Sequence, residues 1–496
     1  MTTKPEETQD TSKNLENPNN KSISLWAALI PVFALVGMLF YNVFFVYGDD
    51  ALSGSNQFVL LLGAAVAAVV GVYYKVSITK MIDEVGENIK STSGAILILL
   101  LVGSLAGTWL ISGIIPTMIY YGLQLLNPTI FLAACVVICA IISVATGSSW
   151  TTSATVGIAL IGIGNTLGIS AGMTAGAVLS GAYFGDKMSP LSDTTNLAPA
   201  MAGGDLFTHI RYMALTTVPT IIITLIVFVI LGLNINTSGV PEINDQLEAI
   251  SDAFNISPWL FIVPALVILL IVKKVAPLVA LLAGTLLGAL AAIIAQPEIV
   301  ISITDASELT FKSAYQGVMN AITINTQVET SSAELNDLFS SGGMSGMLNT
   351  IWLIICAMTF GGIMDAIGAL TKISDALLSV AKTIFGLFAS TVASCLALNI
   401  AASDQYLAIV VPGKMFKQAY QDRNLAPENL SRTLEDSGTV TSVLIPWNTC
   451  GAYQSGVLGV GVGEYFAFAI FNWLSPFMTL IFAAFNIKIK MILAKS

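Results

Sequence analysis

Long apolar runs, separated by short polar segments, dominate the chain. Each run approaches or exceeds the roughly 20 residues that a helix needs to cross a bilayer, and none alternates in polarity as the strands of a membrane barrel do. The pattern therefore predicts an all-α polytopic membrane protein. The thirteen predicted spans are 24–46, 58–74, 94–121, 129–145, 154–168, 171–202, 210–233, 258–272, 275–295, 347–368, 376–400, 433–453 and 464–486.

The distribution of lysine and arginine predicts the orientation of these spans. Basic residues collect in alternate connections, whereas 47–57, 122–128 and 454–463 contain none. Positively charged loops stay on the cytoplasmic side, so both termini are predicted to be cytoplasmic. An odd number of spans conflicts with this unless one more partial pass exists. The apolar piece 405–412 is too short to span alone, and we predict that it is re-entrant.

Composition supports this class and excludes others. The chain of 496 residues is 55% hydrophobic and only 10% charged, whereas a soluble domain carries about 25% charged residues. No phosphate-binding loop of the type GxxxxGK[ST] is present, so no ATP-driven mechanism is indicated. The chain is predicted to be a transporter and not an enzyme. Residues 1–22 are polar and are predicted to be a disordered cytoplasmic tail. The expected environment is a lipid bilayer, with no nucleic acid as a partner.

The chain divides into two halves that resemble each other. The first transmembrane half is placed at 23–234, with a core motif at 146–200, and an extracytoplasmic loop at 235–257 follows it. The second half is placed at 258–496, with an extracytoplasmic loop at 296–346 and a core motif at 399–450.

The two core motifs match at offsets between 250 and 255 residues. Ser148 matches Ser403, Leu179 matches Leu430 and Asp186 matches Asp436. The spans before the two motifs run in opposite directions, which predicts inverted-topology repeats. Such repeats place substrate sites near the midplane, at broken helices. The Pro, Gly, Ser and Thr content of both motifs suits broken and re-entrant helices, because hydroxyl groups satisfy the freed backbone.

The densest polar cluster inside an apolar run is 185–196. Sodium prefers hard oxygen ligands, and a carboxylate binds either a sodium ion or a proton, which is the minimum requirement for exchange. Asp193 is our first choice for the exchanging group, because hydroxyl residues flank it. The alternatives are that Asp193 caps a helix and that Asp186 pairs with Lys187. The cluster contributes Asp186, Ser192, Asp193, Thr194, Thr195 and Asn196, with Asp186 and Asp193 as the metal-binding carboxylates.

Six further residues complete the predicted cation- or proton-binding set: Ser148, Thr151, Asp404, Asp436, Asn448 and Thr449. Asp404 lies at the tip of the re-entrant piece, and the alternative is an exposed loop acid. Asp436 directly follows Glu435, and neighbours on a helix point to different faces, so only one of the two needs to face the interior. His209, the single histidine, is predicted to lie at the surface.

The run from Gly181 to Pro199, GAYFGDKMSPLSDTTNLAP, resembles the signature of the NhaC family of sodium/proton antiporters, within the ion transporter superfamily. The segments 146–153 and 436–449 are similar to further segments of that family. The resemblance implies a secondary transporter in the bacterial inner membrane that exchanges Na⁺ for H⁺ and has no cofactor. Some members exchange malate for lactate, so coupled transport of small carboxylates is the alternative. The resemblance leaves open a homodimer and the role of 296–346.

Overall fold

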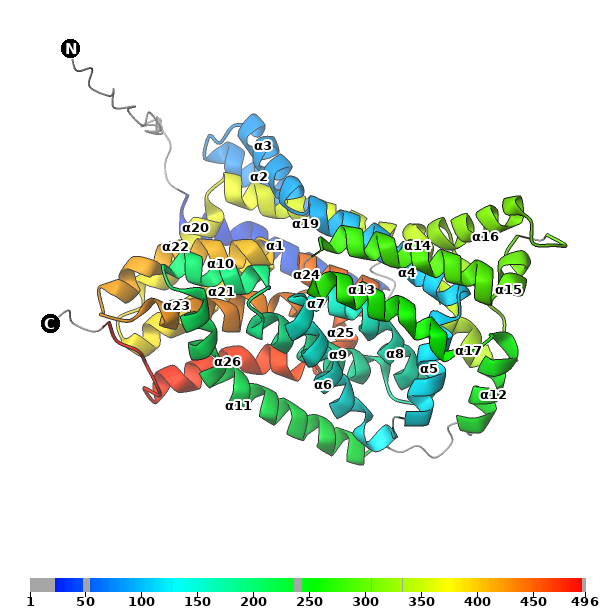
Figure 1. Cartoon of the computed structure of the whole chain (residues 1–496). Coiled ribbons are helices and arrows are strands. Elements are labelled where there is room, and N and C mark those ends of the chain that lie inside the picture. The colour runs from blue at the N-terminus through cyan, green and yellow to red at the C-terminus, as the bar shows by residue number, and fades with distance from the viewer. Residues whose placement is uncertain are drawn as a thin grey trace, which may run out of the picture.

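The computed structural model describes residues 23–47, 54–125, 127–235, 243–273, 275–304, 306–331 and 333–492 (Figure 1). Within them, eight helices are long and apolar enough to cross a membrane, and a further pair, Asn244–Ala253 and Pro258–Val272, is bent by 83°. The predicted class, an all-α polytopic membrane protein, is confirmed. The predicted tail at 1–22 lies outside the described residues.

The helices of the first half follow the apolar runs. They are α1 (Leu25–Tyr41, extended by a π-helical turn at Asn42–Tyr47), α2 (Ser55–Tyr73), α3 (Ile78–Ser91), α4 (Ser93–Ile111), α5 (Ile114–Leu125), α6 (Pro128–Thr146), α7 (Ser149–Thr152, joined through a π-helical turn at Ser153–Gly157 to α8, Ile158–Thr166), α9 (Ala171–Met188), α10 (Asp193–Ala202) and α11 (Leu206–Leu233).

The second half has more short elements. They are α12 (Ile243–Ala253), a 3₁₀ turn (Pro258–Phe261), α13 (Ile262–Val272), α14 (Pro277–Ala295), α15 (Pro297–Ser302), α16 (Phe311–Thr323), β1 (Thr326–Gln327), α17 (Ala333–Leu338), β2 (Ser340–Ser341), α18 (Gly343–Gly346), α19 (Leu348–Ala366), α20 (Ala369–Ser379), α21 (Ile384–Ala401), α22 (Gln405–Gln421), α23 (Pro427–Leu434), a π-helical turn (Glu435–Thr439), a 3₁₀ turn (Ser442–Leu444), α24 (Thr449–Leu458), α25 (Val462–Tyr465) and α26 (Ile470–Ala484). Strands β1 and β2 pair antiparallel.

Several predicted spans differ from the observed helices, as does the piece predicted to be re-entrant. The span at 94–121 is two helices, α4 and α5, because the chain breaks at Gly113, whose φ is 77°. The span at 376–400 starts within α20, and its long helix, α21, begins only at Ile384. The piece at 405–412 is the first half of α22, which continues to Gln421 with Phe416 and Tyr420 buried on one face. The length of the apolar run did not predict that α22 continues beyond residue 412, because the other face of this helix is polar.

The connections predicted as loops also contain helices. The segment 235–257 holds α12, and 296–346 holds α15, α16, α17 and α18 together with the two-stranded sheet. The helix α16 is amphipathic, with Ala314, Gly317 and Ala321 buried on one face. Such short helices lack the continuous apolar run that identifies a span, so the hydrophobic pattern alone did not reveal them.

The two halves repeat with a constant offset. Six helices of the first half begin 256 residues before a helix of the second half: Ser55 and Phe311, Pro128 and Ile384, Ser149 and Gln405, Ala171 and Pro427, Asp193 and Thr449, and Leu206 and Val462. The left-handed residues Gly147 and Ser403, with φ of 72° and 59°, have the same separation. Asp186 therefore corresponds to Ser442, and the match of Asp186 with Asp436 from the sequence was wrong by six residues.

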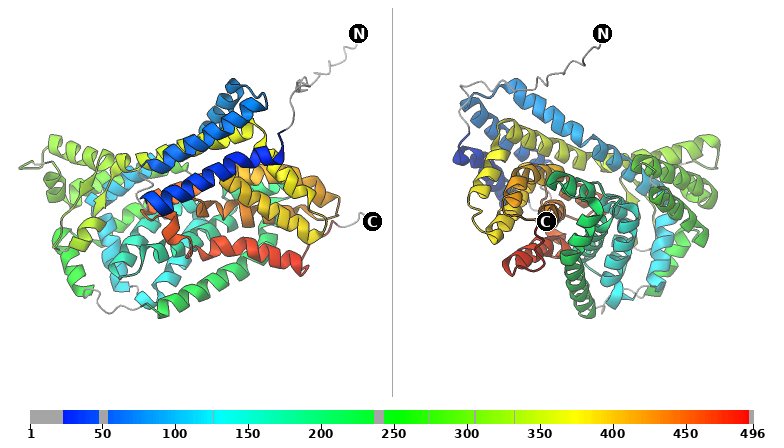
Figure 2. Two further views of the ribbon diagram at one scale, coloured as in Figure 1. Left: turned by 180° about the vertical axis from the view of Figure 1, so that it is seen from behind. Right: turned by 60° about the vertical axis from the view of Figure 1, so that its left-hand side comes forward.

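The repeats have inverted topology. Helix α11 corresponds to α25 and α26 of the second half. Helices α11 and α26 run antiparallel along one side of the molecule (Figure 1). Tyr212, near the start of α11, donates a hydrogen bond of 2.7 Å to the carbonyl oxygen of Lys488, which follows the end of α26. Figure 2 places α2, α3 and α19 on the opposite side of the molecule, with the interrupted helices between these two layers.

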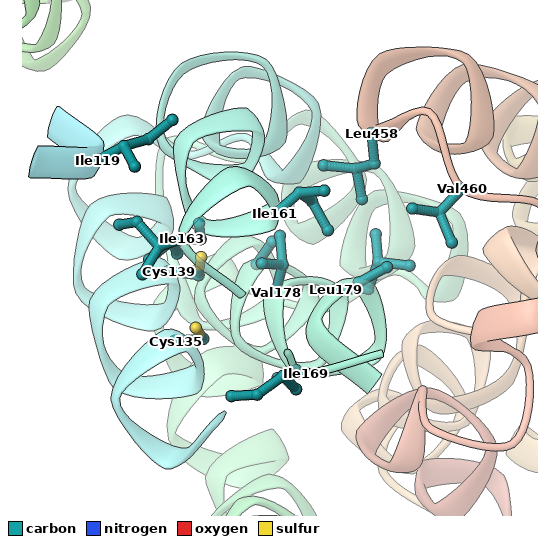
Figure 3. Close-up of a cluster of buried hydrophobic side chains, with 14 of the residues drawn as sticks. Ile119, Cys135, Cys139, Ile161, Ile163, Ile169, Val178, Leu179, Leu458 and Val460 are labelled. Carbon is teal, nitrogen blue, oxygen red and sulfur yellow. The ribbon is translucent and has the colours of Figure 1, made fainter. Parts of the chain in front are cut away.

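Close packing of small residues joins α6 and α9. The core beside them combines Ile161, Val178 and Leu179 with Leu458 and Val460 from the second half, and it also buries Cys135 and Cys139 (Figure 3). A Cβ atom added at Gly181 would lie 2.2 Å from the carbonyl oxygen of Val136. The backbones of α6 and α9 approach so closely that only glycine fits at this position.

We expect Gly181→Ala to lower the free energy of unfolding by about 1–3 kcal/mol, because overpacking forces backbone shifts. The measurement is the thermal unfolding midpoint of the purified protein in detergent. The matched control is Gly37→Ala in α1, where a Cβ atom would meet nothing within 4 Å. Equal midpoints for the two variants would contradict the close contact of α6 with α9.

Candidate cation-binding site

A cavity of about 640 Å³ lies where the interrupted helices of both halves meet. The turn between α6 and α7 contributes Ser148 and Thr151, and the chain around the α9–α10 break contributes Asp186 and Asp193. The second half contributes Asp404, Tyr406 and Thr449. The remaining wall includes the turns between α3 and α4 and between α13 and α14. Six of the twelve predicted site residues therefore line one cavity: Ser148, Thr151, Asp186, Asp193, Asp404 and Thr449.

Two equivalent turns form the tips of the broken helices. In the first, left-handed Gly147 ends α6 and the hydroxyl of Ser148 accepts a hydrogen bond of 3.2 Å from the backbone N–H of Thr151. In the second, left-handed Ser403 follows α21 and Oδ1 of Asp404 accepts one of 3.0 Å from the N–H of Leu407. Each cap starts a new helix at the cavity. Its side-chain oxygen accepts a hydrogen bond from one of the backbone N–H groups that the start of a helix leaves without a partner.

Asp186 lines the cavity, and its two carboxylate oxygens differ in their surroundings. Its side chain is 7% exposed, and Oδ2 accepts hydrogen bonds from the hydroxyl and the backbone N–H of Ser149, at 2.6 and 3.1 Å. Oδ1 has no hydrogen-bond partner among the described residues. The alternative of a pair with Lys187 does not form, because Lys187 turns to Asp436 instead. Asp186 is thus fixed through one oxygen, whereas the other is buried without a hydrogen-bond partner among the described residues.

Asp193 is more fully occupied than Asp186. Its Oδ1 accepts a hydrogen bond of 2.8 Å from the N–H of Thr194, and its Oδ2 accepts one from the hydroxyl of Tyr406. The side chain is exposed. Asp193 therefore supports the first turn of α10 and links the two halves. It is not the helix cap of the alternative interpretation, because the N-cap of α10 is Ser192. Tyr406 did not emerge from the sequence, although it lies 256 residues after Trp150 of the first motif.

Four other residues of the cluster stabilise the α9–α10 break through hydrogen bonds made away from the cavity. The hydroxyl of Ser192 accepts from the N–H of Thr195 at 3.3 Å and lies 3.2 Å from the hydroxyl of Thr194. The hydroxyl of Thr195 donates to the carbonyls of Asp186 and Lys187. The amide of Asn196 donates to the carbonyl of Ser192 at 2.6 Å. Ser192, Thr194, Thr195 and Asn196 do not line the cavity.

In the second half, Asp404 is not an exposed loop acid, because its side chain is only 4% exposed. Asn448 caps α24 by accepting a hydrogen bond of 3.0 Å from the N–H of Cys450, and its amide donates to Asn399 at 3.1 Å. The N–H of Thr449 donates to the carbonyl of Ser403 at 2.9 Å, which joins the second tip to α24. Asp404 and Thr449 face the cavity, whereas Asn448 supports it.

The structure does not bring Asp436 to the cavity. Asp436 forms a buried ion pair with Lys187 and accepts hydrogen bonds from the hydroxyls of Thr216, at 2.9 Å, and Thr479. Only one of Glu435 and Asp436 needed to face the interior, and in the structure both are fully buried. Both lie in the π-helical turn Glu435–Thr439, where the wider turn changes the direction of successive side chains.

His209 is also buried rather than at the surface. Its side chain is 0% exposed, and its Nδ1 lies 2.7 Å from the hydroxyl of Ser431. It lies in the first turn of α11, whose N-terminus the predicted topology put at a membrane edge. Packing of α23 against α11 covers it, and that long-range contact is not visible in the local sequence.

The cavity offers oxygen ligands but no cluster of metal-binding side chains among the described residues. No group of three or more His, Cys, Asp or Glu side chains in the described part of the chain is close enough to hold one metal ion. The oxygen atoms available at the cavity belong to separate carboxylates, to hydroxyl groups and to backbone carbonyls of the broken helices. Sodium is a hard ion with a single charge, and mixed neutral and anionic oxygen ligands are suitable for it.

Inverted repeats of broken helices around a polar cavity at their interface are the architecture of secondary transporters. Residues 181–487 match the Na⁺/H⁺ antiporter family. The chain is 37% identical over 430 residues to the Na⁺/H⁺ antiporter NhaC of Alkalihalophilus pseudofirmus, covering 87% of this chain and 90% of that protein. It is 37% identical over 397 residues to NhaC of Bacillus subtilis, covering 80% and 84%. This chain belongs to the Na⁺/H⁺ antiporter family.

A relative with a different substrate is similar over the same extent. The malate-2H⁺/Na⁺-lactate antiporter of Bacillus subtilis is 35% identical over 438 residues, covering 87% of this chain and 88% of that protein. The resemblance seen in the sequence is thus confirmed at the level of the family.

Proposed function

We propose that this protein is a secondary active transporter that exchanges Na⁺ for H⁺ across the bacterial inner membrane. The observation that carries the proposal is the unpartnered Oδ1 of Asp186 at the cavity between the two inverted repeats. A sodium ion there would be held by this oxygen together with hydroxyl or carbonyl oxygens of the tips. Movement of one repeat against the other would expose the same site to either side of the membrane in turn.

The charge of the cavity favours a cation over an organic anion. Three aspartates line it, and among the described residues neither a lysine nor an arginine does. A carboxylate substrate would require a positive group to offset its charge. The alternating lysine and arginine content of the connections supports cytoplasmic termini, and the proposed exchange needs no cofactor.

The test is a dye-reported pH change in everted membrane vesicles after addition of NaCl. We expect NaCl to dissipate a preformed proton gradient in vesicles that contain the protein, and choline chloride to have no effect. No response to NaCl, together with a response to malate or lactate in the presence of Na⁺, would replace cation exchange by carboxylate exchange.

A further inference from the structure

A second polar cluster lies behind the cavity and is not used by the cation site. It consists of Lys187 on α9, His209 on α11, Arg432 on α23, and Glu435 and Asp436 in the π-helical turn, all 0% exposed. Ionisable side chains are seldom buried without a partner or a role, because removing a charge from water carries a large free-energy penalty.

Glu435 stands out in this cluster, because neither of its carboxylate oxygens has a hydrogen-bond partner in the described ranges. A carboxylate ion in this position would lack the hydrogen bonds that normally offset its burial. A protonated carboxyl group carries no net charge and avoids most of that penalty. The surroundings in this conformation therefore suit Glu435 with a proton bound.

Neither Lys187 nor Arg432 forms an ion pair with Glu435 in the described part of the chain. Lys187 pairs with Asp436, whose other oxygen accepts from Thr216 and Thr479. The guanidinium of Arg432 lies over the rings of Tyr212, Phe388 and Phe482, at 4.6, 6.0 and 5.7 Å from the ring centroids. None of its three nitrogens has a hydrogen-bond partner within the described part of the chain.

The other titratable groups near Glu435 complete its setting. Asp186, Asp436 and Lys187 interact electrostatically with its carboxyl group. Cys395 of α21, which packs against the π-helical turn, is a buried free thiol. The Nδ1 atom of His209 lies 2.7 Å from the hydroxyl of Ser431, and Lys187 interacts electrostatically with the imidazole ring. With Lys187 and Asp436 paired, the charge at Asp186 is the one that changes when a cation binds in the cavity.

We propose that Glu435 is a proton-binding site distinct from the cation site, and that Na⁺ at Asp186 and a proton at Glu435 exclude each other electrostatically. This inference rests on the proposed function. With Asp186 ionised and no cation bound, its negative charge favours a proton on Glu435. A bound sodium ion cancels that charge, so Glu435 releases its proton to water. Coupling of this kind is reciprocal, so a proton on Glu435 weakens Na⁺ binding by the same factor.

The experiment measures Na⁺ binding and proton release in parallel on purified protein. NaCl is titrated into weakly buffered detergent solution, with a pH dye for released protons and ²²Na⁺ for binding. We expect Na⁺-dependent proton release from the wild type. In Glu435→Gln, which resembles the protonated side chain, Na⁺ still binds but with the lower affinity that a proton on Glu435 imposes, and proton release is lost. In vesicles, this variant should catalyse ²²Na⁺/Na⁺ exchange but not Na⁺/H⁺ exchange.

The matched control is Glu428→Gln, a buried glutamate two turns earlier whose Oε1 pairs with Lys490 at 2.6 Å. We expect it to bind Na⁺ and release protons as the wild type does. Proton release from Glu435→Gln equal to that of the wild type would overturn the inference. Absence of Na⁺ binding in the wild type would instead overturn the proposed function, so the two failures are distinguishable.

A measurement on the wild type avoids dependence on the folding of a variant. Infrared difference spectra on Na⁺ addition should show loss of the C=O stretching band of a protonated carboxyl group. The conservative variant Glu435→Asp should retain this change at a shifted frequency, which assigns the band to residue 435. An unshifted band in Glu435→Asp, or no loss of such a band in the wild type, would contradict the inference.

Discussion

Asp186→Asn is expected to abolish Na⁺-driven proton movement in everted vesicles. The substitution keeps the shape of the side chain and its contacts with Ser149, but it removes the negative charge of a residue that lines the cavity. In metal sites, loss of residues that only support a ligand lowers affinity by roughly 10–100-fold. Loss of the charged ligand itself should have at least that effect.

The matched comparison is Asp193→Asn, because Asp193 lines the same cavity as Asp186. An asparagine at 193 still accepts the hydrogen bond from the N–H of Thr194 through its one oxygen, and its amide group can donate to the hydroxyl of Tyr406 in place of the bond that Oδ2 accepts. We therefore expect substantial exchange in this variant, with both proteins inserted at normal levels. Retained activity in Asp186→Asn combined with loss in Asp193→Asn would reverse the assignment and restore the first choice made from the sequence.

Lys187→Met should cause the largest loss of stability. Lys187 and Asp436 are 249 residues apart and link α9 of one half to the π-helical turn of the other, with side chains that are 0% and 1% exposed. Breaking a buried ion pair by removing one partner costs about 3–5 kcal/mol, because the other charge stays buried and unpaired. The measurement is the loss of binding-competent protein after heating in detergent.

A double variant separates the ion pair from general packing. Lys187→Met combined with Asp436→Asn removes both charges and leaves hydrogen-bonding groups for Thr216 and Thr479. It should be more stable than Lys187→Met alone. Lys490→Ala, which breaks the partly exposed pair with Glu428, should have a much smaller effect, about 1 kcal/mol or less. A double variant no more stable than Lys187→Met would argue against a stabilising ion pair.

The break between α9 and α10 was predictable from local sequence, whereas the different roles of Asp186 and Asp193 beside it were not. A run of Ser, Pro, Asp and Thr inside an apolar segment cannot continue a plain helix, and the structure interrupts the helix at Ser189–Ser192. Which carboxylate stays free depends on Ser149 and Tyr406. Both reach the cluster from elsewhere in the fold, so the sequence around Asp193 gave no indication of its occupied oxygens.

The repeat was visible in the sequence, but its register was not. Short similar strings gave offsets from 250 to 255, because few identical residues remain to fix an alignment. Helix starts and the left-handed turns at Gly147 and Ser403 fix it at 256. In a duplicated fold, the backbone geometry is retained after most identical side chains have been replaced. The register of 256 residues also explains why Tyr406 and Trp150 occupy equivalent positions.

By itself, the sequence determined the membrane class, most of the long helices, the two core motifs and the acidic cluster at 185–196. These follow from local patterns, since about 20 apolar residues suffice to specify a span and a few polar residues suffice to break one. Only the tertiary structure decided that Lys187 pairs with Asp436, that Glu435 and His209 are buried, and that Asp186 keeps a free oxygen at the cavity. Each of these depends on contacts between helices distant in sequence, and such contacts determine which buried charge has a partner.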